Sequence, residues 1–468
     1  MPQHEAGQDG WHVPPWVRVP RLEAILGCRL GDLDWSRVAA LASDAQPEDL
    51  TLEYKERLYG NSDAERRELA KDVASLANAS GGLLIIGLRE GDAGEPHTLT
   101  KVALEDAERN RMRQILSTTI APLLPDLQMG ELRDPADPGR GVFLILVPAS
   151  DSAPHGVQSG DRYSWPVRHD RTTHYMREPE IAARYRDRAA GAGRQATRLA
   201  AVRADGRDRL WSSDSWLAVS VVPAQPGRIP TDIEPFRHWL RDLGSDVPWP
   251  LSEDTVVLGR RRVIVSERMP YDGHSRFQHL ELHSDGAGFA AMQLTHGVRR
   301  PHDADRLGHP ETTRYLHVDA VARWTLGLLH ILANHAVRAG GSGDLLTVTE
   351  LLPSYPAATV IGPGQPVERS DLEDPLAIVE DHAILGDRVV PGSRRLTWPT
   401  ALETTVPISV VASPADLVAA AADIARELVV EFGALPTNPV LGLDGRVNPG
   451  AAPRNTDLVR WAERIARG

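Results

Sequence analysis

Three glutamates and one lysine near the start of the chain have the types and spacing for chemistry on a phosphate ester. Glu53 and Lys55 lie two residues apart, Glu48 precedes them, and Glu90 follows a later apolar run. Mg²⁺ and Mn²⁺ prefer a few carboxylates with water and substrate oxygens, and such an ion activates water for phosphodiester hydrolysis at neutral pH. We therefore expect the three glutamates to be catalytic residues that ligate Mg²⁺ or Mn²⁺.

Lys55 is the fourth expected catalytic residue. Its ammonium group can orient the nucleophile or stabilise the pentavalent phosphate, because a fixed cation offsets the charge that develops in the transition state. An ordinary surface is the alternative interpretation, since a Glu and a Lys two residues apart are common on exposed strands and such a pair contributes little. The two interpretations differ in whether the three carboxylates converge.

A strand must position the first of these side chains. Leu50–Lys55 alternates apolar and polar residues, which predicts a half-buried strand with Leu52 and Tyr54 inside. The polar residues of the same strand then share the other face, and a one-residue slip would expose the apolar set. We expect that polar face to line a groove: Thr51, Glu53 and Lys55.

A helix and a second strand follow. Ser62 and Glu65 form a capping box, and apolar residues recur behind it at helical spacing. After two glycines, Leu83–Leu88 is a continuous apolar run, which is typical of a strand buried on both faces. Because Glu90 follows that run closely, the two strands are expected to bring it to Glu53.

Four motifs, in this order, resemble the Schlafen-type (AlbA-like) domain, a family often labelled a divergent ATP-binding domain. They are ExLTLEYKE from Glu48, LANASGGLLIIGLRE ending at Glu90, LVPASDSAPH, and Tyr163 followed by VRHDRTT. The resemblance spans residues 46–188. One departure is Asp170, which stands where the family has the glycine of R-x-G-x-x-T.

This resemblance implies nucleic-acid chemistry more than nucleotide binding. Some family members cleave tRNA or other RNA with three acids in this part of the domain, and those acids map onto Glu48, Glu53 and Glu90. A P-loop is excluded, because it needs a lysine directly after a glycine. The chain has only three lysines and none follows a glycine: Lys55, Lys71 and Lys101.

The charge of the chain is unevenly distributed. The formal net charge of −12 argues weakly against a general nucleic-acid binder, but residues 162–209 hold twelve arginines and six acidic residues, a local charge of +6. Such a surface steers phosphate to one face, although solvated helices rich in Arg–Asp pairs are the plainer interpretation. The residues of this window expected to contact nucleic acid are Arg162, Arg168, Arg171, Thr173 and Arg177.

Length and composition indicate a soluble protein of two or three domains. The single cysteine, Cys28, excludes an intrachain disulfide. No apolar run approaches the roughly 18 residues that a membrane helix needs, and the first residues lack the basic start and apolar core of a signal peptide. We expect a cytoplasmic protein without a membrane partner.

The order of elements predicts the α+β class, because strands and helices mix without regular βαβ alternation. In residues 210–468 we predict an antiparallel sheet and two apolar helices, Val318–Val337 and Ala415–Phe432, which serve as core or as a dimer face. The expected domains are a lead-in segment at 1–45, a Schlafen-like mixed-sheet domain at 46–190, an Arg/Ala/Gly-rich linker at 191–209, and a C-terminal α/β domain of unrecognised family at 210–468.

Our leading hypothesis is a Schlafen-like nucleic-acid-binding protein that acts as a metal-dependent endoribonuclease, with RNA favoured over DNA. The alternative is a non-catalytic DNA-binding transcriptional regulator whose C-terminal domain senses a signal or forms a homodimer, and nucleotide binding ranks third. A weaker metal-site hypothesis concerns His279, Glu281 and His283, which alternate along one strand. Such residues are ordinary on the solvated face of a strand.

Overall fold

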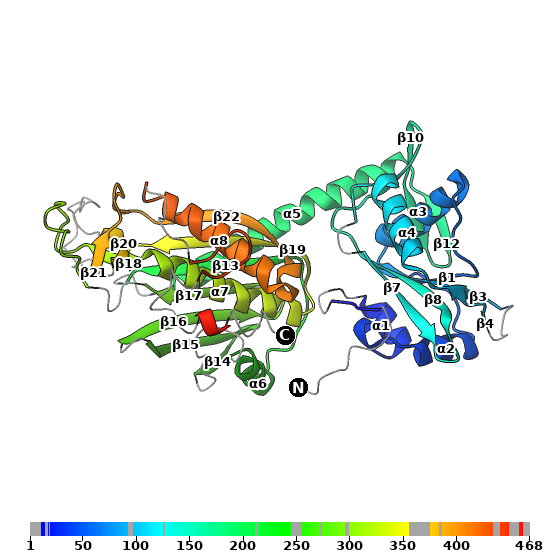
Figure 1. The fold of residues 1–468 in the computed structure, drawn as a ribbon, viewed down its shortest axis with the longest axis horizontal. Coiled ribbons are helices and arrows are strands. Elements are labelled where there is room, and N and C mark those ends of the chain that lie inside the picture. The colour runs from blue at the N-terminus through cyan, green and yellow to red at the C-terminus, as the bar shows by residue number, and fades with distance from the viewer. Residues whose placement is uncertain are drawn as a thin grey trace. The chain divides into compact units, whose positions relative to one another are not determined.

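The chain divides into two units, residues 1–193 (unit 1) and 194–468 (unit 2), each with its own core. Figure 1 shows the ribbon of this computed structural model. The structure describes residues 11–461 apart from 15–16, 18, 92–96, 125–126, 211–213, 245–254, 272–273, 295–298, 355–374, 383–385, 434–439 and 449–457. The last helix, which we predicted at 457–466, lies mostly outside the described residues; 458–461 are helical.

Unit 1 contains short helices at its start, a central sheet with two longer helices, and two small hairpins. In chain order its elements are α1 (Pro20–Leu26), η1 (Leu30–Asp32), α2 (Trp35–Ser43), β1 (Leu52–Lys55), α3 (Asp63–Ala77), β2 (Gly81–Ile86), β3 (Leu88–Arg89), β4 (Thr98–Leu99), β5 (Val102–Ala103), α4 (Asp106–Thr119), β6 (Ile120–Ala121), β7 (Gln128–Asp134), β8 (Asp137–Pro148), β9 (Gly156–Ser159), β10 (Arg162–Ser164), β11 (Pro166–His169) and β12 (Thr172–Tyr175).

The central sheet of unit 1 is mixed. Its order is β1-β2-β8-β5, and β7 also pairs with β8. The β1–β2 pair is parallel, whereas β2–β8, β7–β8 and β5–β8 are antiparallel. Gly82 permits the close approach of β2 to β1, because a Cβ there would lie 2.6 Å from the Thr51 carbonyl oxygen. A mixed sheet with segregated helices confirms the expected α+β class.

Helices α3 and α4 cover one face of this sheet, and α1 and α2 lie on the other side (Figure 1). Leu69 and Val73 of α3 and Met112 of α4 are fully buried with Phe143 of β8. The predicted capping box begins α3, where the Ser62 side chain accepts from the Glu65 N–H. The helix therefore starts at a fixed residue, and its apolar stripe faces the sheet.

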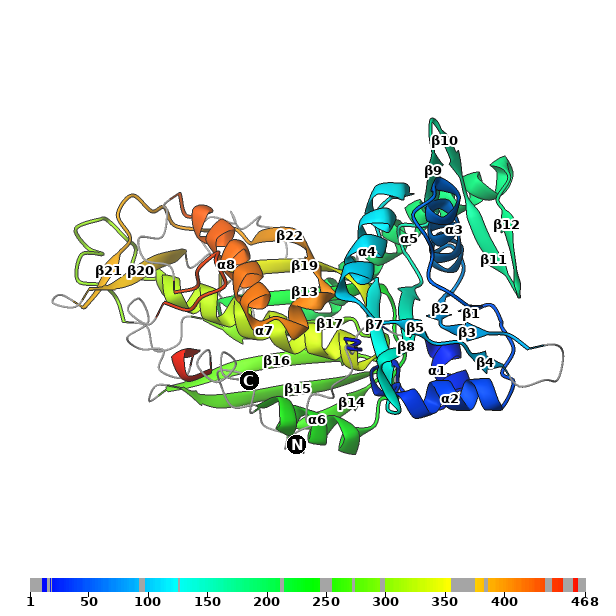
Figure 2. The same cartoon turned by 45° about the vertical axis from the view of Figure 1, so that its right-hand side comes forward.

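Two hairpins extend from unit 1 beside α3, as Figure 2 shows from a second angle. We predicted that Tyr163–Arg168 forms one strand, but the structure divides it at Trp165. The first half, β10, pairs with β9, and the second half, β11, pairs with β12. The two halves therefore belong to separate small sheets, β10-β9-β6 and β11-β12.

The predicted linker at 191–209 is instead mostly helix. It belongs to α5 (Glu178–Arg207), which crosses the boundary between the units without a break. Alanine and arginine are among the strongest helix formers, so composition alone favours this outcome. Only a few positions need to be apolar, because Leu199 and Val202 are the ones that pack on the sheet of unit 2.

Unit 2 is a seven-stranded antiparallel sheet covered by helices on both faces. The order is β14-β15-β16-β17-β13-β19-β22, and a smaller sheet has the order β18-β20-β21. The elements are β13 (Trp216–Gln225), α6 (Ile233–Gly244), β14 (Val256–Gly259), β15 (Arg262–Tyr271), β16 (His274–His283), β17 (Gly288–Gln293), β18 (Arg314–His317), α7 (Val318–Arg338), β19 (Ser342–Leu352), β20 (Leu376–His382), β21 (Gly386–Val389), β22 (Thr400–Pro407), η3 (Ile408–Ala412) and α8 (Pro414–Val430).

The second half of α5 packs on one face of the large sheet, and α7 packs on the other. Alternation along β13 explains this arrangement: Trp216 and Ala218 face α5, so Leu217 and Val219 face α7. The apolar helices predicted near 318–337 and 415–432 are both core helices, α7 and α8, and they contact each other. Among the described residues, no helix combines the length and the apolar character needed to span a bilayer.

Candidate functional site

The structure brings the predicted acidic residues of unit 1 together. The Glu48 N–H donates to Glu90 Oε1 at 3.3 Å, and Glu48 Oε1 accepts from the Tyr54 N–H at 2.8 Å. Lys55 Nζ lies 2.5 Å from Glu53 Oε1. Strand β1 therefore holds Glu53 and Lys55 as neighbours, while the end of β3 carries Glu90 to the segment before β1. These residues are therefore neighbours, but Glu48 contacts Glu90 through its backbone N–H and not through its carboxylate.

Arg168 of β11 lies in the middle of the carboxylates. Its Nη1 pairs with Glu53 Oε2, and its Nη2 lies 3.6 Å from Glu48 Oε2. It also donates to the backbone, from Nε to the Asp49 carbonyl at 2.8 Å and from Nη2 to the Leu52 carbonyl at 3.1 Å. The guanidinium is thus fixed on four sides, and it ties the β11–β12 hairpin to the strand that carries Glu53.

A further acid, which the sequence analysis did not identify, completes the cluster. Asp72 of α3 is buried, with its Oδ2 3.2 Å from Lys55 Nζ and accepting from Tyr59 Oη at 2.7 Å. The feature of the sequence that could have identified Asp72 is its position beside the apolar stripe of α3. We call Glu48, Glu53, Lys55, Asp72, Glu90, Arg168 and Arg171 the charged cluster.

Burial and neighbouring charges set the protonation of two members. Burial raises the pKa of Glu48 above its usual value, and the neighbouring carboxylates of Glu53 and Glu90 raise it further. For Lys55, burial lowers the pKa, but Asp72 and Glu53 outweigh burial and raise it. Lys55 therefore stays an ammonium group at neutral pH and cannot serve as a general base.

The charged cluster does not fit Mg²⁺ or Mn²⁺ in this arrangement. The carboxylate oxygens that would ligate the ion already face the Arg168 guanidinium and the Lys55 ammonium group. Over the ranges that the structure describes, no three His, Cys, Asp or Glu side chains are placed to share a metal ion. A metal ion would have to displace Arg168 from the carboxylates. In this structure the side chains of Arg168 and Lys55 neutralise the carboxylates of the cluster.

Two expectations about this region are wrong. We predicted that Thr51, Glu53 and Lys55 line a groove, but Thr51 is fully buried and Glu53 is only 7% exposed. Both faces of β1 are covered, because Arg168 packs over the polar face while the apolar face holds Leu52 and Tyr54, which are buried as predicted. The sequence pattern alone resembles that of a half-exposed strand.

The second wrong expectation is that Arg168 contacts nucleic acid. Its side chain is 3% exposed and is committed to Glu53 and the backbone of β1. The other residues predicted to contact nucleic acid lie nearer the surface. Arg162 and Arg177 are exposed, Thr173 is half-buried opposite Arg168, and Arg171 is half exposed in an ion pair with Glu90 at 2.6 Å.

The turn between β11 and β12 keeps a glycine-like backbone without a glycine. Asp170, at the position of the family's glycine, has a φ of 56°. Aspartate tolerates this left-handed conformation better than most residues, so the hairpin reverses as the motif requires.

A motif asparagine fixes the same region from the other side. Asn78, at the end of α3, donates to the carbonyls of His155 and Pro166 at 2.9 and 2.8 Å and accepts from the His155 N–H at 2.6 Å. The His155 ring is buried, with one nitrogen 2.7 Å from Ser150 Oγ, and burial lowers its pKa. Asn78 and His155 are therefore structural, and they hold the starts of β9 and β11.

The basic window at 162–209 is not one surface. Five of its arginines belong to unit 2, and four of these pair with acids on the large sheet or in one of its turns. These pairs are Arg198–Asp285, Arg203–Glu350, Arg207–Glu350 and Arg209–Glu281. The sequence window thus overstates the free positive charge, since part of it neutralises buried acids.

The row of His279, Glu281 and His283 is buried, not solvated. Glu281 is fully buried and lies 3.0 Å from Arg262, 3.2 Å from Arg209 and 3.0 Å from His279. Helix α5 covers this part of the sheet, and guanidinium groups neutralise the Glu281 carboxylate. In the part of the chain that the structure describes, these three side chains do not form a metal site.

Comparison with known families agrees with the motifs. Residues 48–177 match the family model described as Schlafen, AlbA_2. The match falls inside the range 46–188 that the motifs indicated, and it includes every residue predicted to be catalytic or to contact nucleic acid. Searches among curated proteins and among solved structures returned no match. The family suspected from the sequence is therefore confirmed for this part of unit 1, and it supports a nucleic-acid-related function.

Proposed function

We propose that this protein, whose residues 48–177 form a Schlafen-type AlbA_2 domain, binds nucleic acid at the exposed hairpins of unit 1. The observation that carries the proposal is the exposure of cationic side chains on and beside these hairpins. Arg162 lies on β10, Arg171 at the turn before β12, and Arg177 directly after β12. Guanidinium groups at such positions contact phosphate oxygens and release counterions.

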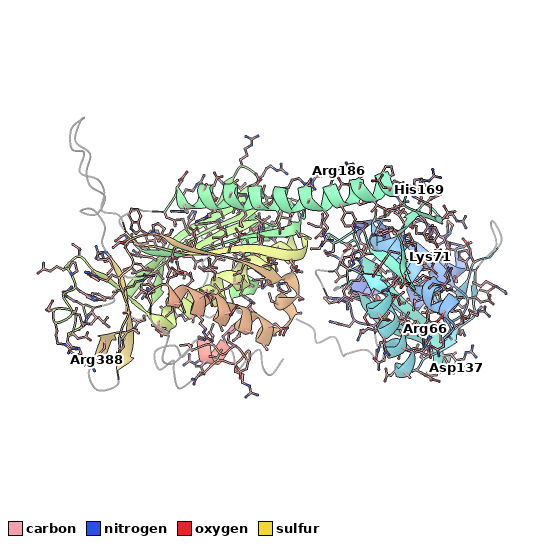
Figure 3. All side chains as sticks on the ribbon, turned by 90° about the horizontal axis from the view of Figure 1, so that it is seen from above. Arg66, Lys71, Asp137, His169, Arg186 and Arg388 are labelled. Carbon is pink, nitrogen blue, oxygen red and sulfur yellow. The ribbon has the colours of Figure 1, made fainter. Side chains whose placement is uncertain are left out.

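Helix α3 adds an exposed arginine next to these hairpins. Arg67 Nη1 donates to Ser159 Oγ of β9 at 3.4 Å, and Ser159 lies opposite Arg162 in the strand register. Arg66 and Lys71 of the same helix, and His169 of β11, are labelled in Figure 3. Exposed guanidinium groups on the outside of an acidic protein, such as those of Arg67 and Arg162, give phosphate a preferred face.

A salt titration tests the proposal. Affinity is measured by fluorescence anisotropy for RNA and DNA of the same sequence, as single strands and as duplexes, over a range of salt. The double variant Arg162→Ala/Arg171→Ala should weaken binding and reduce the slope of log affinity against log salt by roughly 1.5. Arg306→Ala, an exposed arginine of unit 2, is the matched control. An unchanged slope in the double variant contradicts the proposed surface.

Metal-dependent RNA cleavage is a second candidate, favoured by one observation: Glu48, Glu53 and Glu90 lie close enough for their charges to interact. It requires Arg168 to leave the carboxylates, so the two candidates separate experimentally. The purified chain is incubated with tRNA and with single- and double-stranded DNA, in Mg²⁺, Mn²⁺ or EDTA. Cleavage that EDTA abolishes and that Glu90→Gln lowers by orders of magnitude supports an endoribonuclease. Binding without cleavage leaves a non-catalytic binding protein, and a preference for duplex DNA favours a regulator.

A further inference from the structure

We propose that Tyr163 and Trp165 form a stacking platform for unpaired nucleobases, so that the preferred ligand of unit 1 is single-stranded nucleic acid. The proposal rests on the nucleic-acid binding proposed above and narrows its substrate class. Tyr163 lies on β10 and is 45% exposed, and Trp165 follows β10 and is partly exposed. Their ring centroids are 6.2 Å apart and their planes are inclined by 33°.

The hairpin holds these rings outward. Tyr163 lies opposite Gln158 in the register, and its hydroxyl group donates to Gln158 Oε1 at 3.3 Å. Alternation along β9 directs the neighbouring Val157 into the core of unit 1, so Tyr163 occupies the outer face. The core therefore anchors the hairpin through one face and leaves the aromatic face to solvent.

Gly156 supplies the floor of the platform. A Cβ at this position would lie 3.0 Å from Tyr163 Cδ1 and 3.1 Å from Trp165 Nε1. Both rings thus rest directly on the backbone of β9, and this contact limits their motion. A ring whose position is already fixed loses little conformational entropy when a base stacks on it.

Charge beside the rings suits the other part of a nucleotide. Arg162 precedes Tyr163 and is exposed, and Arg67 contacts the residue opposite Arg162, Ser159. Guanidinium groups along a strand edge hold phosphates, while aromatic faces accept bases of any sequence. In a duplex, the faces of the bases are already stacked on one another, so the platform distinguishes unpaired from paired nucleic acid.

The test compares single-stranded and duplex oligonucleotides of about 12 nucleotides in the full chain. Tyr163→Leu should weaken single-strand binding about tenfold, or about 1.4 kcal/mol, and change duplex binding by less than about twofold. Tyr163→Phe should bind like the wild type, because stacking needs the ring and not the hydroxyl group. Tyr185→Leu is the matched control, since this tyrosine of α5 is 47% exposed. A 2-aminopurine base in the single strand should be quenched on binding by the wild type and not by Tyr163→Leu.

The outcomes separate this proposal from the one on which it rests. If the wild type binds neither single strands nor duplexes, nucleic-acid binding itself is wrong. If the wild type binds and Tyr163→Leu keeps full single-strand affinity and full quenching, binding stands and the platform is wrong. If Tyr163→Phe loses as much as Tyr163→Leu, the hydroxyl group and not the ring makes the contact, and stacking is rejected.

Discussion

An ion pair of unit 1 and an ion pair of unit 2 differ in which partner is buried. In unit 1 the Arg168–Glu53 pair is buried on both sides, with side chains 3% and 9% exposed. In the unit 2 pairs of Glu350 with Arg203 and Arg207, only the acid is buried. The Glu350 side chain is 1% exposed, whereas the two arginine side chains are 33% and 36% exposed. The burial of each partner determines which substitution is costly. A charge that is buried and loses its partner cannot be hydrated.

The largest expected effect tests unit 1. Arg168→Met leaves Glu53 without its guanidinium partner and should lower the stability of unit 1 by about 3–5 kcal/mol. Hydrogen exchange of unit 1 peptides measures the loss, and unit 2 peptides serve as the internal reference. Adding Glu53→Gln to Arg168→Met should recover part of the stability, because residue 53 then no longer carries a charge that has lost its guanidinium partner. A loss below about 1 kcal/mol would place this pair with ordinary surface pairs.

The next prediction turns to unit 2, where removal of the exposed arginines should cost more than removal of the buried acid. Arg203→Ala/Arg207→Ala leaves Glu350 buried and unpaired and should cost about 3 kcal/mol, whereas Glu350→Gln should cost about 1 kcal/mol. The two arginines already reach solvent, so they are hydrated when the acid is removed. Urea unfolding of both variants decides the matter, and equal costs would show that exposure does not govern these pairs.

A pH prediction extends the comparison to buried bases. Burial lowers the pKa of His335 to about 4 from an ordinary value of 6.5, and His283, Asp285 and Arg338 contribute smaller shifts. Between these values the unfolded chain binds more protons, so stability is complete above pH 6.5 and falls as the pH approaches 4. At pH 5 the loss expected from His335 is about 2 kcal/mol, and His283 and His330, whose pKa values burial also lowers to about 4, add to it. Thermal unfolding at pH 7 and pH 5 checks it, and His335→Gln should show a smaller difference between the two pH values.

The smallest effect concerns the exposed edge of the charged cluster. Arg171 is half exposed and pairs with Glu90, so Arg171→Ala should change stability by less than about 1 kcal/mol. Thermal unfolding of this variant provides the baseline for Arg168→Met. If Arg171→Ala lowers stability as much as Arg168→Met, the ion pairs of the charged cluster depend on one another. Burial of the Arg168–Glu53 pair would then not explain the large effect of Arg168→Met.

Local patterns in the sequence predicted the elements well. The alternation before Lys55 corresponds to β1, the capping box at Ser62 to the start of α3, and the run at Leu83–Leu88 to β2 and the start of β3. These signals depend on neighbouring residues alone. The four motifs added the family, and with it the convergence of Glu48, Glu53 and Glu90.

The sequence did not show which residues far apart in the chain pair with one another. No local signal separates Arg168, which is buried, from Arg171, which is not, because the difference depends on Glu53 in another element. The same holds for Glu281, which looks like a solvated strand residue until α5 covers it. The segment 191–209 looked like a linker because its few apolar positions become informative only once the sheet beneath them is known.

The pairing of Arg168 with Glu53 also bears on how the chain is made. The two residues are 115 positions apart, and ribosomes add roughly 5–20 residues per second. Glu53 therefore leaves the ribosome roughly ten seconds before its partner exists. During that interval Glu53, whose carboxylate is buried in the folded domain, lacks Arg168. Its remaining cationic partner is Lys55, which also pairs with Asp72. The domain can close only after the β11–β12 hairpin has emerged, so a nascent chain stalled before residue 168 should remain open to proteases at β1.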